Sequence, residues 1–169
     1  MDPVRATRVQ YADLITVVSS YRGTCNRFRT ATTIWDKDGK LISIGYNGSP
    51  KGMPHCDEVG HYIVDNHCVR TIHGERNAIN NSVDLRRLDG ASAVIIGTPC
   101  SDCANSLVSV GIRDIRCLGV YENAKASDYV QYLFKEASVR VEYADINDLL
   151  ETHSMYLEFI LGPCGILKN

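Results

Sequence analysis

The hydrophobic positions change period along the chain, and each change marks a predicted element. Residues 4–20 carry apolar side chains at helical spacing, with Arg8 as an interruption, which predicts an amphipathic helix. Residues 30–35 are rich in β-forming side chains, and the alternating segment 41–46 predicts the returning strand of a hairpin. Between them, residues 36–40 read Asp-Lys-Asp-Gly-Lys, which is typical of a hairpin turn. The apolar positions of the first helix are Val4, Tyr11, Leu14, Ile15 and Val18.

Downstream of residue 72 the pattern alternates between strands and helices, which is typical of an α/β protein with a mixed sheet and right-handed crossovers. Ser127 is the expected N-cap of one helix, and Gly162 and Pro163 are expected to end the last one. The predicted helices cover 73–82, 100–110, 127–136 and 146–160, and the predicted strands cover 91–98, 112–120 and 139–143.

The segment 47–72 has no hydrophobic period and is rich in Gly, Pro, His and Asp. It therefore predicts a long loop. Loops of this length inside a compact domain are usually functional or held in place by something other than burial.

Composition limits the class of protein. A chain of 169 residues predicts one domain over 1–169, with a core at about 4–145 and a C-terminal helix and tail at 146–169. A net charge of −2 argues against a dedicated nucleic-acid binder. No apolar run is long enough for a signal peptide or a membrane span, and seven cysteines, an odd number, argue against a disulfide framework. We expect a cytoplasmic protein without membrane or nucleic-acid partners.

Two short clusters carry the candidate chemistry: His73-Gly74-Glu75 and Pro99-Cys100-Ser101-Asp102-Cys103. A lone C-x-x-C would equally suit a structural zinc knuckle or a redox pair, and a lone H-x-E is close to noise. In this order, with Pro directly before the first Cys, they form the H-x-E…P-C-x-x-C signature of zinc-dependent nucleobase deaminases. The sequence therefore predicts a catalytic zinc centre.

Each residue of the signature has a chemical role. His73, Cys100 and Cys103 would supply three zinc ligands and leave the fourth position for water. Zinc-bound water ionises near neutral pH and can attack an electron-poor ring carbon as hydroxide. Glu75 would not ligate the metal; it would carry the proton from that water to the ring nitrogen and then to departing ammonia.

Three further segments carry a family resemblance: Gly45–Pro50, His55–Glu58 and His67–Ile79. With the zinc signature, they resemble deoxycytidylate (dCMP) deaminase, in its bacterial, competence-protein-like and phage branches. The resemblance implies the cytidine-deaminase fold, a five-stranded mixed sheet flanked by helices in three α/β/α layers. It implies hydrolysis of dCMP to dUMP and ammonia, which supplies pyrimidine deoxynucleotide for dTMP synthesis. It also implies a homohexamer with dCTP and dTTP as effectors, together with Mg²⁺.

The chain departs from the family pattern at three places. Gly74 stands where the family has Ala, and Arg76 replaces an uncharged or acidic residue. Residues 30–33 read Thr-Ala-Thr-Thr in place of Val-Gly-Ala-Val. Since that strand is expected to border the nucleotide, a changed substrate is an alternative.

A second zinc is expected in the long loop. Three thiols and one imidazole make a closed tetrahedral site that would hold a polar loop in place. The resemblance assigns Cys25, Cys56, His61 and Cys68 as its ligands. The alternatives are that His55 or His67 replaces His61, or that the thiols are loose surface groups.

A site that binds a nucleotide phosphate requires Arg or Lys side chains or the N–H groups of a helix N-terminus. Arg27 and Arg29 are candidates, with solvated surface arginines as the alternative. Asn47 could hold a left-handed turn or bind a nucleotide, Thr98 could offer its hydroxyl or carbonyl to cytosine, and Tyr121 could stack on the base or simply pack. Candidates for an effector triphosphate are Asn47, Gly48 and Lys51.

Three other functions compete with dCMP deamination. A deaminase of dCTP, cytidine or a modified dCMP would use the same chemistry. A polynucleotide deaminase is disfavoured by the net charge of −2. A non-catalytic, nucleotide-binding zinc protein is disfavoured because it would have no need of Glu75.

Overall fold

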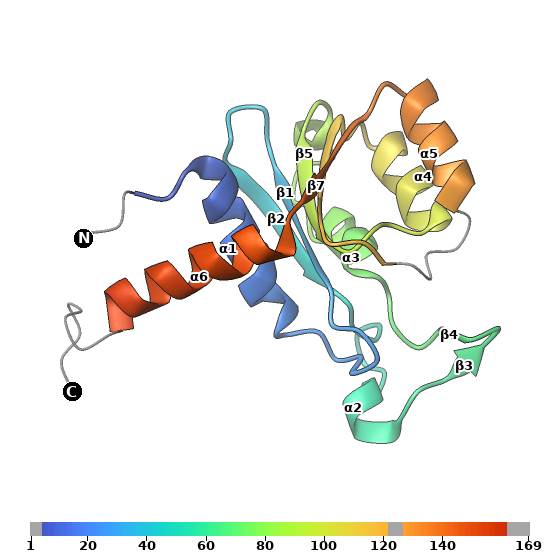
Figure 1. The fold of residues 1–169 in the computed structure, drawn as a ribbon. Coiled ribbons are helices and arrows are strands. Elements are labelled where there is room, and N and C mark those ends of the chain that lie inside the picture. The colour runs from blue at the N-terminus through green and yellow to red at the C-terminus, as the bar shows by residue number, and fades with distance from the viewer. Residues whose placement is uncertain (1–4, 122–126, 162–169) are drawn as a thin grey trace.

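The computed structural model describes residues 5–121 and 127–161. Its centre is a five-stranded sheet in the order β2-β1-β5-β6-β7 (Figure 1). Strand β1 is antiparallel to both β2 and β5, whereas β5, β6 and β7 are parallel to one another. The predicted mixed sheet is thus confirmed. The strands are β1 (Ala31–Trp35), β2 (Leu41–Tyr46), β5 (Ser92–Ile96), β6 (Asp114–Leu118) and β7 (Arg140–Ala144).

Helices cover both faces of the sheet, which gives three layers. Helices α3, α4 and α5 lie on one face, and α1 and α6 lie on the other, with α6 extending beyond the sheet (Figure 1). The helices are α1 (Arg8–Ser20), α3 (Gly74–Asn80), α4 (Ser101–Ser109), α5 (Ser127–Glu136) and α6 (Ile146–Leu161). Within residues 5–121 and 127–161, no helix is both long and apolar enough to span a bilayer.

Several predicted boundaries shift. Helix α1 begins at Arg8 because Thr7 caps it: the Thr7 hydroxyl accepts from the N–H of Gln10, whose side chain accepts from the Thr7 N–H. Ser127 is the first residue of α5 and not its cap. Val4, Gly162 and Pro163, on which other predictions depended, lie outside the described residues.

The predicted loop at 47–72 contains short regular elements. They are α2 (Cys56–Val59) and a hairpin of β3 (Ile63–Val64) and β4 (His67–Cys68). A short 3₁₀ helix (Leu85–Leu88) was also not predicted. These elements are too short for a hydrophobic period to reveal them.

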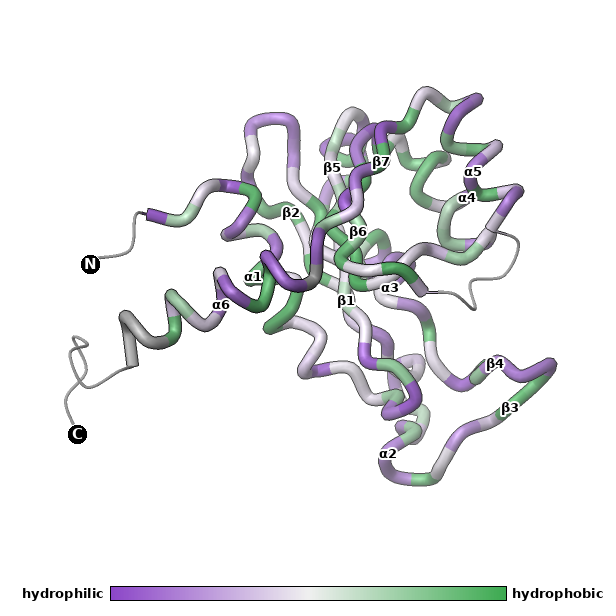
Figure 2. The backbone as a smooth tube through the Cα atoms, in the orientation of Figure 1, coloured by the Kyte–Doolittle hydropathy of each residue, from purple (hydrophilic) through white to green (hydrophobic). Residues whose placement is uncertain are grey.

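Two apolar clusters fill the spaces between the layers. The larger contains Ile34, Ile95 and Leu107, and it lies on the side of α3, α4 and α5. The smaller contains Trp35, Val94 and Leu118 and lies on the side of α1. Figure 2 shows the hydrophobic stretches running through the central strands.

Trp35 is buried between the sheet and α1. Its indole N–H donates to the Thr33 hydroxyl at 2.8 Å, and its ring meets Tyr11 edge-on at a centroid distance of 5.8 Å. The Thr33 hydroxyl also shares a hydrogen bond with Thr16 of α1. Helix α1 is therefore joined to β1 by polar as well as apolar contacts.

A charged network also joins α1 to the parallel strands. Arg116 donates from Nε to Asp13 at 2.9 Å and from Nη1 to Glu142. These carboxylates raise the pKa of Arg116, with Asp13 contributing most. Because Asp13 is buried, losing Arg116 would leave a buried carboxylate unpaired.

Helix α3 sits directly on the backbone of β2 at Gly45. A Cβ at this position would lie 2.1 Å from the Ala78 nitrogen and 2.2 Å from the Gly74 oxygen. These atoms are main chain and cannot rotate away. The glycine therefore fixes the distance between the sheet and the helix that carries Glu75.

Candidate metal and nucleotide site

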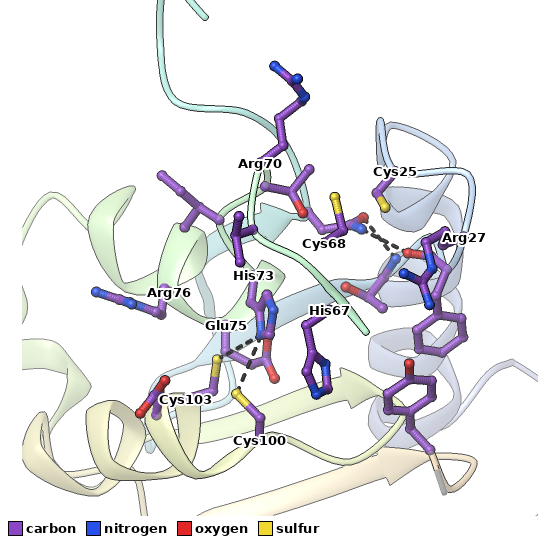
Figure 3. Close-up of a pocket in the computed structure, with 18 of the residues that line it drawn as sticks. Cys25, Arg27, His67, Cys68, Arg70, His73, Glu75, Arg76, Cys100 and Cys103 are labelled. Atoms are coloured by element: carbon purple, nitrogen blue, oxygen red, sulfur yellow. Dashed lines mark hydrogen bonds between the residues drawn. The ribbon is translucent and has the colours of Figure 1, made fainter. Parts of the chain in front are cut away.

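The first candidate metal cluster is formed where two helices begin. His73 is the N-cap of α3 and Cys100 is the N-cap of α4, while Cys103 lies in the first turn of α4. The His73 Nδ1 atom lies 3.5 Å from the Cys100 sulfur and 3.4 Å from the Cys103 sulfur (Figure 3). Helix N-termini favour thiolates electrostatically. The structure therefore brings the three predicted ligands together.

The distances in this cluster suit zinc. Tetrahedral bonds of about 2.3 Å to sulfur and about 2.0 Å to nitrogen place neighbouring S and N atoms roughly 3.5 Å apart. The ligand atoms of His73, Cys100 and Cys103 match this spacing and all lie within 4.8 Å of one another. Three protein ligands leave one position of a tetrahedron open.

Hydrogen bonds among the three candidate ligands favour the thiolate form of Cys100. The hydrogen bond from Cys103 is the main cause that lowers the pKa of Cys100 to about 3, and His73 contributes. That bond to Cys100, together with burial, raises the pKa of Cys103. The hydrogen bond to Cys100 also raises the pKa of His73, against the effect of burial.

Glu75 lies in the first turn of α3 beside this cluster. Its side chain is 6% exposed, and burial raises its pKa. Figure 3 shows the carboxylate beside His73 and Cys103. Cys117 is buried in β6, as expected for a small hydrophobic residue, and burial raises its pKa to about 12.

A second cluster joins the long loop at 47–72 to the segment between α1 and β1. Ligand atoms of Cys25, Cys56, His61 and Cys68 lie within 4.8 Å of one another. The two sulfurs of Cys56 and Cys68 are 3.5 Å apart, and Cys25 Sγ is 3.7 Å from His61 Nδ1. Three sulfurs and one imidazole match the donor set and the spacing of a closed tetrahedral zinc site.

The other two histidines of the loop lie elsewhere. His55 Nδ1 contacts the Thr24 hydroxyl at 3.2 Å, and His55 is the N-cap of α2. His67 lines the pocket described below. Among the three histidines of the loop, the structure therefore places His61 with the cysteines.

The pKa values of Cys56 and Cys68 in this cluster are shifted in opposite directions. Burial is the main cause that raises the pKa of Cys56 to about 12. Burial also acts to raise the pKa of Cys68, but the backbone N–H of Arg70 and the side chains of His61 and Cys56 outweigh it and lower the pKa to about 6. Cys68 is thus the thiol of this pair most easily ionised.

A cavity of about 560 Å³ opens beside the first cluster. It lies outside the carboxyl ends of β5 and β6, where α/β sheets commonly bind ligands. Among the predicted nucleotide-binding residues, Arg27, Asn47, Thr98 and Tyr121 line it, whereas Arg29 does not. Of residues 30–33, only Thr30 lines it, while Ala31, Thr32 and Thr33 are fully buried. Within this strand, contact with the cavity is therefore limited to Thr30.

Two of these polar side chains, those of Asn47 and Thr98, form hydrogen bonds within the protein. Asn47 accepts from the Thr30 N–H at 3.0 Å and donates to the Phe28 carbonyl at 2.8 Å, and its backbone is not left-handed. The Thr98 hydroxyl donates to the Tyr121 carbonyl at 3.1 Å. Both residues shape the pocket wall, and the Thr98 carbonyl is the group that remains for a ligand.

Tyr121 is part of an aromatic pair. Its ring stacks on Phe28 with centroids 4.9 Å apart and an interplanar angle of 9°. One face of Tyr121 is therefore covered by Phe28.

Among the predicted effector residues, Asn47 lines the cavity. Gly48 pairs with Ile72 through the backbone. Lys51 is exposed in a turn and follows Pro50, which also lines the cavity.

Sequence reasoning did not assign several lining residues to the pocket. Phe28 follows an assigned arginine, and Arg76 was noted only as a departure from the family pattern. These residues line the cavity because segments far apart in the sequence meet there, and the local sequence pattern does not predict such contacts. The unassigned residues with polar or aromatic side chains include Phe28, Asn66, His67, Arg70 and Arg76.

The layered sheet and the ligand set borne on two helix starts define the cytidine-deaminase class of α/β protein. The family model of the cytidine and deoxycytidylate deaminase zinc-binding region matches residues 7–118, and the chain belongs to this family.

Named relatives agree with this membership. The chain is 35% identical over 151 residues to ComE operon protein 2 of Bacillus subtilis (strain 168), covering 88% of this chain and 78% of that protein. It is 27% identical over 159 residues to the deoxycytidylate deaminase of Enterobacteria phage T2, covering 71% and 82%. The predicted resemblance to bacterial and phage deoxycytidylate deaminases is confirmed.

Solved structures share the fold. The dCMP deaminase of cyanophage S-TIM5, in complex with dCMP and dUMP, superposes with a TM-score of 0.68 at 19% identity, covering 83% of this chain and all of that one. RibD of Acinetobacter baumannii gives a TM-score of 0.60 at 19% identity, covering 92% of this chain and 40% of that one. The predicted three-layer fold is thus found in other proteins of known structure.

Proposed function

We propose that this protein hydrolyses dCMP to dUMP and ammonia, with zinc held by His73, Cys100 and Cys103. The observation that carries the proposal is the convergence of these three ligand atoms, within 4.8 Å, beside the buried carboxylate of Glu75. Family membership and the deoxycytidylate deaminases among the relatives support dCMP as the substrate.

In the proposed reaction, His73, Cys100 and Cys103 hold the zinc and Glu75 transfers protons. When bound, zinc supplies Lewis-acid chemistry that makes water nucleophilic near neutral pH. Glu75 takes the proton from the attacking water and delivers it to ring nitrogen N3. It then passes a proton to the amino group, so that the C4–N bond breaks and ammonia leaves. Burial of Glu75 excludes bulk water from these transfers.

The second cluster is proposed to hold a structural zinc. Its four ligands are Cys25, Cys56, His61 and Cys68, which together occupy every tetrahedral position. Such an ion would stabilise the segment between β2 and α3, whose hairpin buries little apolar surface. We expect two zinc ions per chain in total.

The resemblance to dCMP deaminases also suggests how the enzyme is regulated and how it assembles. We propose an effector triphosphate, dCTP or dTTP with Mg²⁺, near Asn47, Gly48 and Lys51, and a cytoplasmic homohexamer. Support for the effector site is the exposure of Lys51 close to the pocket rim. Activity measured with and without each triphosphate tests the effector, and light scattering tests the hexamer.

A substrate panel tests the proposed reaction. Ammonia release from zinc-loaded protein is measured with dCMP, deoxycytidine, cytidine and dCTP at matched concentrations. We expect the highest kcat/KM with dCMP, because the pocket contains Arg27, an arginine without a carboxylate partner among the described residues. Equal or faster turnover of another compound would assign the enzyme to that substrate instead.

A further inference from the structure

Helix α1 places polar side chains against the sheet and apolar side chains outward. Thr16 shares a hydrogen bond with Thr33 of β1, and Asp13 pairs with Arg116 of β6. A surface helix normally has the opposite arrangement, with its apolar stripe facing the core. Buried polar groups together with an exposed apolar face are therefore a departure that needs an explanation. The buried residues of α1 are Ala12, Asp13, Thr16 and Ser20.

The outer face of α1 carries four large apolar residues, which we call the α1 stripe. They follow one another at intervals of three, four and three residues, a spacing that puts them on one side of a helix. Three of them are 50%, 56% and 69% exposed in chain order, and Leu14 is half-buried. The α1 stripe consists of Tyr11, Leu14, Val18 and Tyr21.

No charged side chain interrupts the α1 stripe. Between positions 9 and 21 the only charged residue is Asp13, which is buried and paired with Arg116. Arg8 and Arg22 stand at the two ends of the helix. The cores of protein–protein interfaces are enriched in aromatic residues and depleted of charged ones. The composition of the α1 stripe is thus that of an interface core.

The size of the α1 stripe suits a second copy of this chain. Since a whole tyrosine side chain offers about 150–250 Å², the four residues together expose roughly 300 Å² of mainly apolar surface. The smaller stable dimers bury about 600 Å² from each copy, of which a little more than half is apolar. A twofold contact brings the same patch of both copies together, so each stripe would meet a surface of its own size and polarity.

We propose that two copies of this chain associate through their α1 helices, which cross near Leu14 and Val18 with each α1 stripe packed on the other. Residues three and four positions apart form the ridges and grooves by which helices pack. Arg8 and Arg22 lie at the helix ends, where crossed helices diverge. The contact adds a surface to the proposed homohexamer. It does not depend on the proposed reaction, because α1 covers the face of the sheet away from α3 and α4 (Figure 1).

An exchange of charge at Val18 tests the contact. Sedimentation equilibrium at low ionic strength gives the mass of the zinc-loaded full chain, of Val18→Lys, of Val18→Glu, and of the two variants mixed in equal amounts. The parent should be a dimer or an even multiple of one. Each variant alone should have half the parent's mass and associate roughly a hundredfold more weakly or worse, because like charges meet across the twofold axis. The mixture should recover the parent's mass, because the charges are then opposite.

Companion variants separate the contact from folding. Val83→Lys is the matched control, because Val83 is 97% exposed and lies outside α1, and it should keep the parent's mass. Val18→Ala removes apolar area without adding charge and should weaken association several-fold. Emission of Trp35, which lies beneath α1, and zinc content should match the parent in every variant.

A monomeric parent, or the parent's mass in both charged variants, would overturn the proposal. Dissociation by both charges without recovery in the mixture would also overturn it, since the α1 stripe would then contact a different surface. Ammonia release from dCMP is measured on the same samples. Its absence from all of them, the parent included, would refute the proposed function and leave the α1 contact standing.

Discussion

At the scale of single residues, the candidate site depends on groups whose neighbours give them unusual properties. Cys100 sits at a helix start, where hydrogen bonds from Cys103 and His73 lower its pKa to about 3. Glu75, only two residues from His73, is buried, and its pKa is raised. A thiol with a strongly lowered pKa, which is a candidate zinc ligand, and a buried carboxyl group thus lie side by side.

Replacing Glu75 by glutamine should abolish most turnover while leaving the structure intact. We expect kcat to fall by roughly 10²–10⁴-fold, the usual contribution of general acid–base catalysis. Zinc content should not change, because Glu75 is not one of the converging ligands. Steady-state ammonia release and metal analysis measure the two effects.

The matched control is Glu136→Gln, which changes an exposed glutamate of α5. It should retain parental kcat. A Glu75→Gln variant within about tenfold of the parent would show that another group moves the proton.

The chemistry-bearing residues were the most predictable part of the site. Cys100 and Cys103 lie three residues apart, so that one helical turn places both sulfurs together, and His73 completes the signature. Asn47 was less predictable, because the partners of its side chain, Thr30 and Phe28, are far away in sequence.

At the scale of elements, the contact between α3 and β2 sets the position of the Glu75 carboxyl group. Gly45 leaves no space for a side chain between the strand and the helix. Gly74, where the family has alanine, is less constrained: a Cβ there would lie 3.3 Å from the Ala31 Cα atom. The two glycines therefore differ in how much change they tolerate.

Gly45→Ala should destabilise the protein by about 3 kcal/mol or more, because the added methyl overlaps main-chain atoms. Gly74→Ala should stay within about 1 kcal/mol of the parent, since the tight contact is offset by the better helix propensity of alanine. Urea unfolding of both variants gives the comparison. Equal stability of Gly45→Ala and the parent would mean that α3 can move away from the sheet.

Element prediction succeeded where burial gives a hydrophobic period and failed where it does not. All five strands of the main sheet and helices α3 to α6 were predicted to within about three residues at each end. The segment 47–72 was interpreted as a loop because it has no hydrophobic period, and Ile63 and Val64 of its hairpin are exposed. The family resemblance named His61 and Cys68 as candidate metal ligands, but it did not indicate the hairpin beside them.

At the scale of the whole molecule, the protein has two parts that differ in how much apolar surface they bury. The sheet and its helices contain the apolar clusters, including Ile34 and Trp35. The segment from α2 to β4 lies to one side of the sheet (Figure 1) and contains the second ligand set. Loss of a metal there should affect this segment more than the sheet.

Cys56→Ser should lower the zinc content from two ions to one per chain. Hydrogen exchange in residues 55–70 should accelerate roughly tenfold or more, because metal binding at a closed site contributes directly to folding. Exchange in β5 and β6 should change little, since the apolar core holds them. Cys117→Ala, which alters a buried cysteine outside both clusters, should keep two zinc ions. Uniform acceleration across the sheet would argue against a local role.

The burial of Trp35 has a practical consequence. The chain contains one tryptophan, and it lies on the α1 side of the sheet and does not line the cavity beside Glu75. Its emission therefore reports whether α1 remains docked and does not sense an occupied pocket. A red shift on heating would mark separation of that layer, so one optical signal can follow melting without interference from added nucleotide.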